Sequence, residues 1–224
     1  MKKHIPNTLT CLNLITGGIG AIFIIRADYD LAIYFVLISA LFDFFDGFAA
    51  RMLKVQSVIG KELDSLADMV SFGLVPALYM LRVLEGQTNI ENLPYYGLLI
   101  AAFSAVRLAK FNVDDRQSDQ FIGLPTPANT IMIASLSFLP ANWEITLIAT
   151  IVIITVSSFL LVANVPMIAL KFKSFGWKGN ELRFILILSI VILGIIFGIN
   201  ALPFIIPVYI LLSLIGNFIS KKVV

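Results

Sequence analysis

The sequence has little of the residue types on which soluble enzymes and secreted domains depend. It contains one cysteine, Cys11, and one histidine, His4, and 13% of its 224 residues are charged. A single cysteine excludes intramolecular disulfides and a cysteine metal site. His4 lies in the N-terminal tail, where we expect a solvated or interfacial side chain. Because soluble domains carry about 25% charged residues, the scarcity of charge excludes a globular enzyme held by a membrane anchor.

Apolar residues fill most of the chain and predict an all-α, polytopic membrane helix bundle. The sequence is 59% hydrophobic, and its mean hydropathy is +0.95. A membrane-spanning helix needs about 20 predominantly apolar residues, and stretches of roughly this length use almost the whole chain. The expected spans are residues 8–26, 31–52, 60–82, 94–112, 126–141, 145–163, 183–199 and 203–219. These spans leave no room for a separate soluble domain.

The distribution of basic residues predicts the orientation of the bundle. Lysine and arginine are enriched in the cytoplasmic loops of membrane proteins. With the N-terminus inside, 14 of the 16 basic residues are cytoplasmic, and only Arg26 and Arg82 lie outside. We therefore expect an integral protein of the cell (inner) membrane with both termini in the cytoplasm. The 14 are Lys2, Lys3, Arg51, Lys54, Lys61, Arg107, Lys110, Arg116, Lys171, Lys173, Lys178, Arg183, Lys221 and Lys222.

Four aspartates lie at the facing ends of the second and third predicted spans. Asp43 and Asp46 are three residues apart, and Asp64 and Asp68 are four apart, so each pair shares one face of a helix. A charged aspartate at the centre of a membrane helix costs about 2.5–3.5 kcal/mol, so four of them require compensation. Oxygen ligands suit Mg²⁺, Mn²⁺ or Ca²⁺. Opposed across an antiparallel helix pair, the four predict a site for two divalent cations of the kind that supports phosphoryl transfer.

Small and basic residues accompany these acids. Gly47 leaves room for a ligand to approach the backbone, Ala50 keeps the helix face small, and Arg51 can pair with a carboxylate or a phosphate. Two other interpretations stay open. The acids could pair with basic residues only to hold the bundle together, or they could form the ion pathway of a cation transporter. A transporter predicts acids spread along the membrane, whereas these cluster at one depth.

The spacing D-x2-D-G-x2-A-R-x8-G-x3-D-x3-D over residues 43–68 resembles the signature of the CDP-alcohol phosphatidyltransferase family. The resemblance extends over residues 5–165. It implies a six-helix core in residues 1–165, with a basic interfacial segment and two additional transmembrane helices in residues 166–224. It also implies displacement at the β-phosphorus of a CDP-linked lipid by an alcohol, with release of CMP. The scarcity of histidine and the lack of an obvious nucleophile favour direct displacement over a covalent enzyme intermediate. A homodimer is expected from the same resemblance.

Family roles are carried over residue by residue. The resemblance implies that Mg²⁺ or Mn²⁺ ions bind Asp43, Asp46, Asp64 and Asp68, and that Asp68 is also the general base. It implies that the residues lining the CDP pocket are Gly47, Ala50, Arg51 and Gly60.

Segments outside this motif resemble the branch of the family that uses L-serine as the acceptor and CDP-diacylglycerol as the donor. They are residues 5–18, 63–77, 107–112 and 121–129. The candidate contacts to serine or to the lipid phosphate are Arg107, Lys110, Asn112 and Thr126. Arg107 could bind a carboxylate with two hydrogen bonds, although Arg107 and Lys110 also fit a simple positive-inside role. A glycerol 3-phosphate or inositol phosphate acceptor is the open alternative, and it would need a denser basic pocket.

A basic and aromatic stretch follows the sixth predicted span. It consists of Lys171, Phe172, Lys173, Phe175, Trp177, Lys178 and Arg183. In a membrane protein this composition predicts a segment at the interface with anionic lipid headgroups. No nucleic-acid partner is expected.

Overall fold

A computed structural model of the protein has helical segments within all eight predicted spans, but the predicted span 126–141 holds only a nine-residue α-helix, Thr126–Ala134, and a short 3-10 helix, Ser135–Phe138. It describes residues 4–55, 57–114, 121–140, 143–168, 176–177 and 180–222. The elements, in order, are α1 His4–Ile25, α2 Tyr29–Leu53, α3 Val58–Asp68, η1 Met69–Leu74, α4 Val75–Gln87, η2 Leu93–Leu98, α5 Leu99–Val113, β1 Phe121–Ile122, α6 Thr126–Ala134, η4 Ser135–Phe138, α7 Leu147–Val162, β2 Pro166–Met167, α8 Glu181–Phe197, η5 Gly198–Ala201 and α9 Leu202–Lys222.

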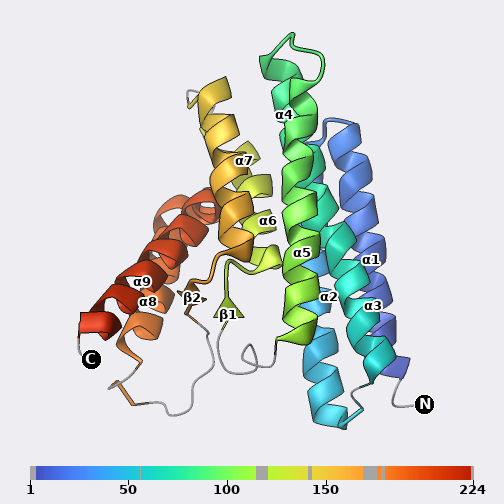
Figure 1. The fold of residues 1–224 in the computed structure, drawn as a ribbon, viewed down its shortest axis with the longest axis vertical. Coiled ribbons are helices and arrows are strands. Elements are labelled where there is room, and N and C mark those ends of the chain that lie inside the picture. Colours follow the sequence, from blue (N-terminus) through green and yellow to red (C-terminus); the bar gives the residue numbers. More distant parts are fainter. Residues whose placement is uncertain are drawn as a thin grey trace.

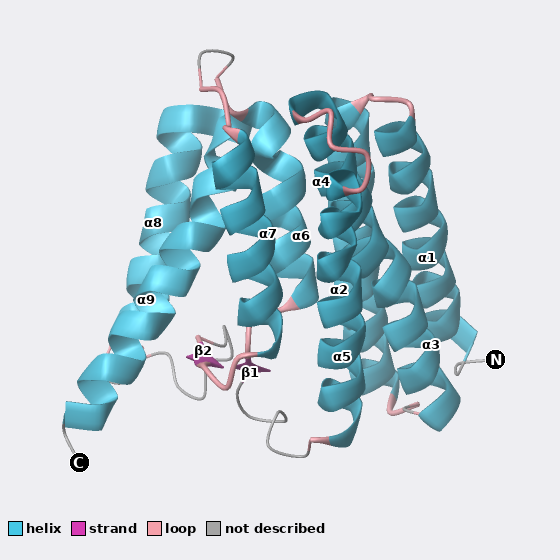
Figure 2. Ribbon diagram, turned by 45° about the horizontal axis from the view of Figure 1, so that its top comes forward, coloured by secondary structure: helices cyan, strands magenta, loops and turns pink. Residues whose placement is uncertain are grey.

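The predicted fold class, an all-α polytopic membrane bundle, is confirmed. Five helical segments among the described residues are long and apolar enough to cross a membrane, namely residues 4–25, 29–53, 58–87, 93–113 and 181–218, and α7 is a shorter apolar helix. The last of the five contains both α8 and α9, which form a hairpin (Figures 1 and 2). The first and last helices place their free ends at the same end of the bundle (Figure 1). Most of the basic part of residues 169–179 lies outside the described residues.

The third span differs from the prediction, which treated residues 60–82 as one regular helix. A π-helix, η1, interrupts it immediately after Asp68. Single π-turns insert an extra residue into a helix and occur often at functional sites. Here the π-turn is anchored to α6, because Thr130 Oγ1 donates to the Phe72 carbonyl over 2.8 Å. The π-turn is therefore stabilised by tertiary packing. Its extra residue rotates the side chains that follow it relative to those that precede it.

A short antiparallel pairing of β1 with β2 was not predicted. It brings the segment before α6 against the end of α7. Gly123 has a φ of +79°, and its N–H donates to the Val165 carbonyl over 2.9 Å. A Cβ atom at this position would lie 2.6 Å from the Leu161 carbonyl oxygen, so only glycine fits. This contact determines where α6 begins and therefore where Thr126 lies.

Two apolar clusters hold the helices together. The larger joins α1, α2, α4, α5, α6 and α7 around fully buried side chains such as Ile33, Met80 and Ile154. The smaller joins the α8–α9 hairpin to α6 and β2, and it includes Leu186 and Met167. The hairpin thus packs against one edge of the bundle, as Figure 2 shows.

The packing of η2 on α4 gives a test of the fold. A Cβ atom on Gly97 would lie 2.8 Å from the Leu81 backbone nitrogen and 2.9 Å from the Ala77 carbonyl oxygen. Backbone atoms of a helix cannot move aside easily, so Gly97→Ala is expected to destabilise the protein by about 1–3 kcal/mol. Gly86→Ala is the control, because nothing lies within 4 Å of the added atom. Thermal unfolding in detergent should show a lower Tm for the first variant only; equal Tm values would contradict the close packing.

Candidate active site

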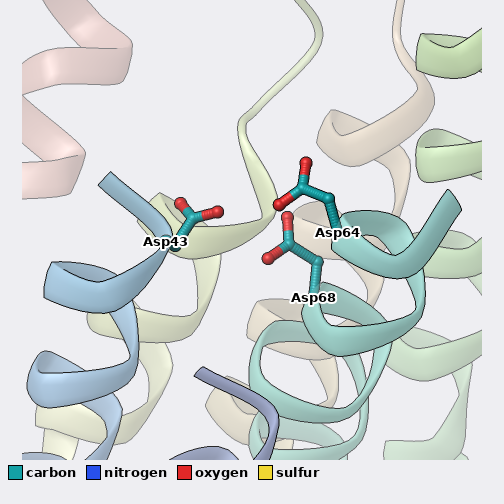
Figure 3. A group of neighbouring side chains, drawn as sticks. All are labelled: Asp43, Asp64 and Asp68. Atoms are coloured by element: carbon teal, nitrogen blue, oxygen red, sulfur yellow. The ribbon is translucent and has the colours of Figure 1, made fainter. Parts of the chain in front are cut away.

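Three of the four predicted metal ligands converge. Asp43 on α2 and Asp64 and Asp68 on α3 have carboxylate oxygens that all lie within 4.8 Å of one another. Their side chains point toward a common space between the two helices (Figure 3). Asp68 is buried and the other two are half-buried. The i, i+4 spacing of α3 and the antiparallel course of α2 bring these side chains together, as the sequence predicts.

The donor set fits a divalent cation. Within the described part of the chain, no lysine or arginine lies within ion-pair distance of the three carboxylates. One oxygen of Asp64, Oδ1, is buried and has no hydrogen-bond partner there. Carboxylates that are this close and this poorly solvated repel one another unless a positive charge lies between them. Oxygen-only donors are those that Mg²⁺ and Mn²⁺ prefer.

Asp46, the fourth predicted ligand, lies outside this group. Its side chain is buried, and its Oδ2 accepts a 2.7 Å hydrogen bond from Thr10 Oγ1 on α1. The i, i+3 offset from Asp43 therefore places Asp46 toward α1. Its assignment as a metal ligand stays a prediction.

A cavity of about 530 Å³ opens beside the acids. Its lining includes all four residues predicted for the CDP pocket, Gly47, Ala50, Arg51 and Gly60. The remaining lining residues come from α1, α2, α3, α5 and the connection before α3, and they are Pro6, Asn7, Thr10, Asp46, Val55, Ser57, Val58, Lys61, Asp64 and Phe111. A Cβ atom on Gly47 would point toward Arg51 Nη1 at 3.6 Å, so a glycine here keeps space open beside the guanidinium group.

The cavity has positive charge at its mouth. Arg51 and Lys61 line it, together with the first turn of α3. Ser57 caps that turn, since Gly60 N–H donates to Ser57 Oγ over 3.0 Å. The free N–H groups and the dipole of a helix N-terminus favour anions, phosphates in particular. A phosphorylated ligand in this cavity would thus meet cationic groups near the helix ends and the acids farther in.

Arg107 and Thr126, predicted from separate segments, are brought together. Arg107 is 7% exposed, and its Nη1 donates to Thr126 Oγ1 over 3.3 Å. Its guanidinium carbon lies 5.6 Å from the centre of the Phe111 ring. Asp68 and Asp43 are near enough to interact with it electrostatically. Its Nε is buried without a hydrogen-bond partner in the described part of the chain, which leaves a donor for a ligand.

A second cavity, of about 320 Å³, also adjoins α5. Arg107 and Lys110 line it together with Val113, Asp114, Ile122, Leu161, Val162, Ala163 and Asn164. Asn112 is directed elsewhere. Its Nδ2 donates to Ser65 Oγ on α3 over 2.9 Å, and its carbonyl accepts from Lys61 Nζ over 2.6 Å. The structure therefore separates Asn112 from the other three candidate serine contacts and makes it a link between α3 and α5.

Sequence reasoning assigned no role to two polar residues of α1 that contact the acids. Thr10 binds Asp46, and Asn13 Nδ2 donates to Asp68 Oδ1 over 3.2 Å. The signal that could have found them is the spacing of Pro6, Thr10, Asn13 and Gly17, which follows one face of an otherwise apolar helix. All four are buried.

Comparisons with known proteins show which family the sequence resembles. The family model of CDP-alcohol phosphatidyltransferases matches residues 3–216. A CDP-diacylglycerol–serine O-phosphatidyltransferase of Bacillus subtilis is 34% identical over 61% of this chain and 76% of its own length. One from Helicobacter pylori is 29% identical over 98% of this chain and 93% of its own length. An archaetidylserine synthase of Methanothermobacter thermautotrophicus is 31% identical over 70% of this chain and 66% of its own length.

The matched region includes the acidic group, both cavities and most of the α8–α9 hairpin. This chain belongs to the CDP-alcohol phosphatidyltransferase family.

Proposed function

We propose that this enzyme transfers the phosphatidyl group of CDP-diacylglycerol to the hydroxyl group of L-serine, giving phosphatidylserine and CMP. The observation that carries the proposal is the cluster of Asp43, Asp64 and Asp68 at the edge of the cavity lined by Gly47 and Arg51. The names of the relatives support the same acceptor, because two are CDP-diacylglycerol–serine O-phosphatidyltransferases and one is an archaetidylserine synthase.

The larger cavity is proposed to hold the CDP moiety. Gly47, Ala50 and Gly60 present little side chain to it, so a nucleotide can lie against the backbone of α2 and α3. Arg51, Lys61 and the first turn of α3 are suited to the diphosphate. The acyl chains are left in the bilayer, since only the headgroup is polar enough to enter the bundle.

The acids are proposed to supply the chemistry. When bound, divalent cations held by Asp43, Asp64 and Asp68, with Asp46 as the further predicted ligand, would neutralise charge on the diphosphate and on the departing CMP. The serine hydroxyl oxygen forms a bond to the phosphatidyl phosphorus while the bond from that phosphorus to the CMP oxygen breaks. Asp68 accepts the hydroxyl proton, and CMP leaves with the bonding electrons. This is a direct displacement without a covalent enzyme intermediate.

The smaller cavity is proposed to admit serine. L-Serine carries a carboxylate, and Arg107 offers it a guanidinium group whose position is held by Thr126. Lys110, farther along the same face of α5, adds a second positive charge. Among the described residues that line this cavity, these two are the basic ones, which is fewer than a phosphorylated alcohol would favour.

The location and assembly of the enzyme are part of the same proposal. The excess of basic residues at the end of the bundle that carries both termini supports an active site open to the cytoplasm in the cell (inner) membrane. Residues 1–165 are proposed as the catalytic core and residues 166–224 as an addition to it. A homodimer stays a prediction from the family.

The acceptor is tested by CMP release from CDP-diacylglycerol with L-serine, glycerol 3-phosphate and inositol phosphate in parallel. We expect release and a new phospholipid with serine only, in the presence of Mg²⁺ or Mn²⁺. Release with a phosphorylated alcohol and not with serine would replace the acceptor and leave the family chemistry intact.

The metal assignment is tested with Asp64→Asn. Losing one anionic oxygen weakens a shared cation site, so Mn²⁺ binding and turnover are both expected to fall, turnover to background. Glu62→Gln is the matched control, because it removes the same charge from the exposed side of the same helix. Binding of Mn²⁺ is followed by electron paramagnetic resonance. Equal effects of the two substitutions would contradict a specific site.

The role of Arg107 is tested with Arg107→Ala and Lys110→Ala. A hydrogen bond to a charged group is worth about 1.5–3 kcal/mol, or roughly one to two decades. Arg107→Ala is therefore expected to raise the KM for serine by about that factor and to change the KM for CDP-diacylglycerol little. Lys110→Ala is expected to have the smaller effect. A loss confined to CDP-diacylglycerol would assign Arg107 to the lipid phosphate instead.

A further inference from the structure

Asn13 touches the acidic group from α1, and none of the chemistry above uses it. Its side chain is fully buried, and Nδ2 donates to Asp68 Oδ1 over 3.2 Å. The opposite orientation of the amide would place its oxygen against the carboxylate oxygen, so the hydrogen bond determines which way the amide faces. Asn13 Oδ1 is buried without a hydrogen-bond partner among the described residues, so the bond from Nδ2 to Asp68 is the interaction that compensates part of the cost of burying this amide.

The backbone of Asn13 is held from three elements. Its carbonyl oxygen accepts hydrogen bonds from Thr16 Oγ1 on α1 at 3.0 Å, Ser39 Oγ on α2 at 3.2 Å and Ser71 Oγ on η1 at 3.0 Å. Gly17 makes this approach possible, because a Cβ atom there would collide with the Ser71 side chain. Asn13 is thus anchored to α2 and to the π-turn, the two segments adjoining the acids.

The anchoring gives Asp68 a preferred orientation. A carboxylate can rotate about its bond to the chain, and the terminal torsion of aspartate is broad. A donor held in place on Oδ1 restricts that rotation and leaves Oδ2 for other partners. Asparagine is neutral, so it orients Asp68 without neutralising the negative charge that a cation requires. An arginine or lysine at this place would compete with the cation.

We propose that Asn13 is a positioning residue, which holds one oxygen of Asp68 so that the other faces the cation and the acceptor hydroxyl. The inference rests on the proposed function in taking Asp68 as a metal ligand and proton acceptor. The hydroxyl groups of Ser39 and Ser71 act on Asp68 only through Asn13, by holding its backbone.

Asn13→Leu, of similar size, removes the donor. We expect kcat to fall roughly 10- to 100-fold, the equivalent of one hydrogen bond to a charged group. The KM values for CDP-diacylglycerol and serine are expected to change by less than about threefold, because an interaction used mainly in the transition state lowers kcat and leaves KM nearly unchanged. Thr150→Val is the control for the loss of a buried hydrogen bond, since Thr150 on α7 is buried, its hydroxyl donates to the Thr146 carbonyl, and it lines neither cavity. Its kcat is expected to stay near that of the unmodified enzyme. Similar losses of kcat in both variants would make Asn13 a packing residue and overturn the proposal.

A double-mutant cycle with Asp68→Asn gives a second readout that does not depend on turnover. Mn²⁺ binding is measured by electron paramagnetic resonance on the full-length protein in detergent. Asn13→Leu is expected to weaken Mn²⁺ binding when Asp68 is present and to have no further effect in the Asp68→Asn protein, because coupled residues are not additive. Additive losses would overturn the proposal.

The cycle also separates this proposal from the proposed function. If the unmodified protein released CMP with none of the alcohols, the function would fail, while the coupling of Asn13 to Asp68 in Mn²⁺ binding would still be measured. Thermal unfolding is recorded for each variant. Should Asn13→Leu not fold, Asn13→Ala replaces it in both experiments with the same expected outcomes.

Discussion

Mutual repulsion among carboxylates inside an apolar bundle is the constraint on which the site depends. Each charged aspartate in a membrane helix is costly, and three of them share a space less than 5 Å across here. The nearby donors, Asn13 to Asp68 and Thr10 to Asp46, are neutral. Neutral donors orient the acids without neutralising them, and the Arg107 guanidinium interacts with Asp68 and Asp43 without forming an ion pair, so the group is arranged to receive cations and, with them, the phosphates that cations bind.

The helices around this group divide the space into two cavities with different chemistry. The larger one has Gly47, Ala50 and Gly60 on its wall and basic groups at its mouth, which suits a nucleotide diphosphate. The smaller one has Arg107 and Lys110, which suits a small anion. The two cavities adjoin the same face of α5, with Phe111 lining the first and Arg107, in contact with Phe111, lining the second. Asp64 lines the first cavity, and Asp68 interacts electrostatically with Arg107 of the second, so the acids relate to both cavities.

Sequence periodicity predicted the features that follow from helical geometry. The helical segments and the convergence of Asp43 with Asp64 and Asp68 follow from hydrophobic length, from 3.6 residues per turn and from the short connection that makes the two helices antiparallel. The predicted span at residues 126–141 is the exception, because α6 has only nine residues. Hydrophobic periodicity could not predict features that depend on tertiary packing. The π-turn after Asp68 is stabilised by Thr130, which lies on a different helix. The β1–β2 contact and the turn of Asn112 toward Ser65 likewise join segments far apart in the chain. Periodicity placed Asp46 on the same face as Asp43, but only the position of α1 decides that it meets Thr10.

The depth of the acids explains why basic groups stand in front of them. At a rise of about 1.5 Å per residue, Asp64 lies about 9 Å from the start of α3, and Asp43 and Asp68 lie about 15 Å from the neighbouring helix ends. Arg51 and Lys61 lie within the turn nearest those ends. A diphosphate that enters from these helix ends passes basic side chains before it reaches the acids. Arg51, Lys61 and the N-terminus of α3 beside them can replace part of the hydration that the diphosphate loses on the way. The order of charges along the cavity is thus a consequence of performing phosphoryl transfer on a substrate whose tails stay in the bilayer.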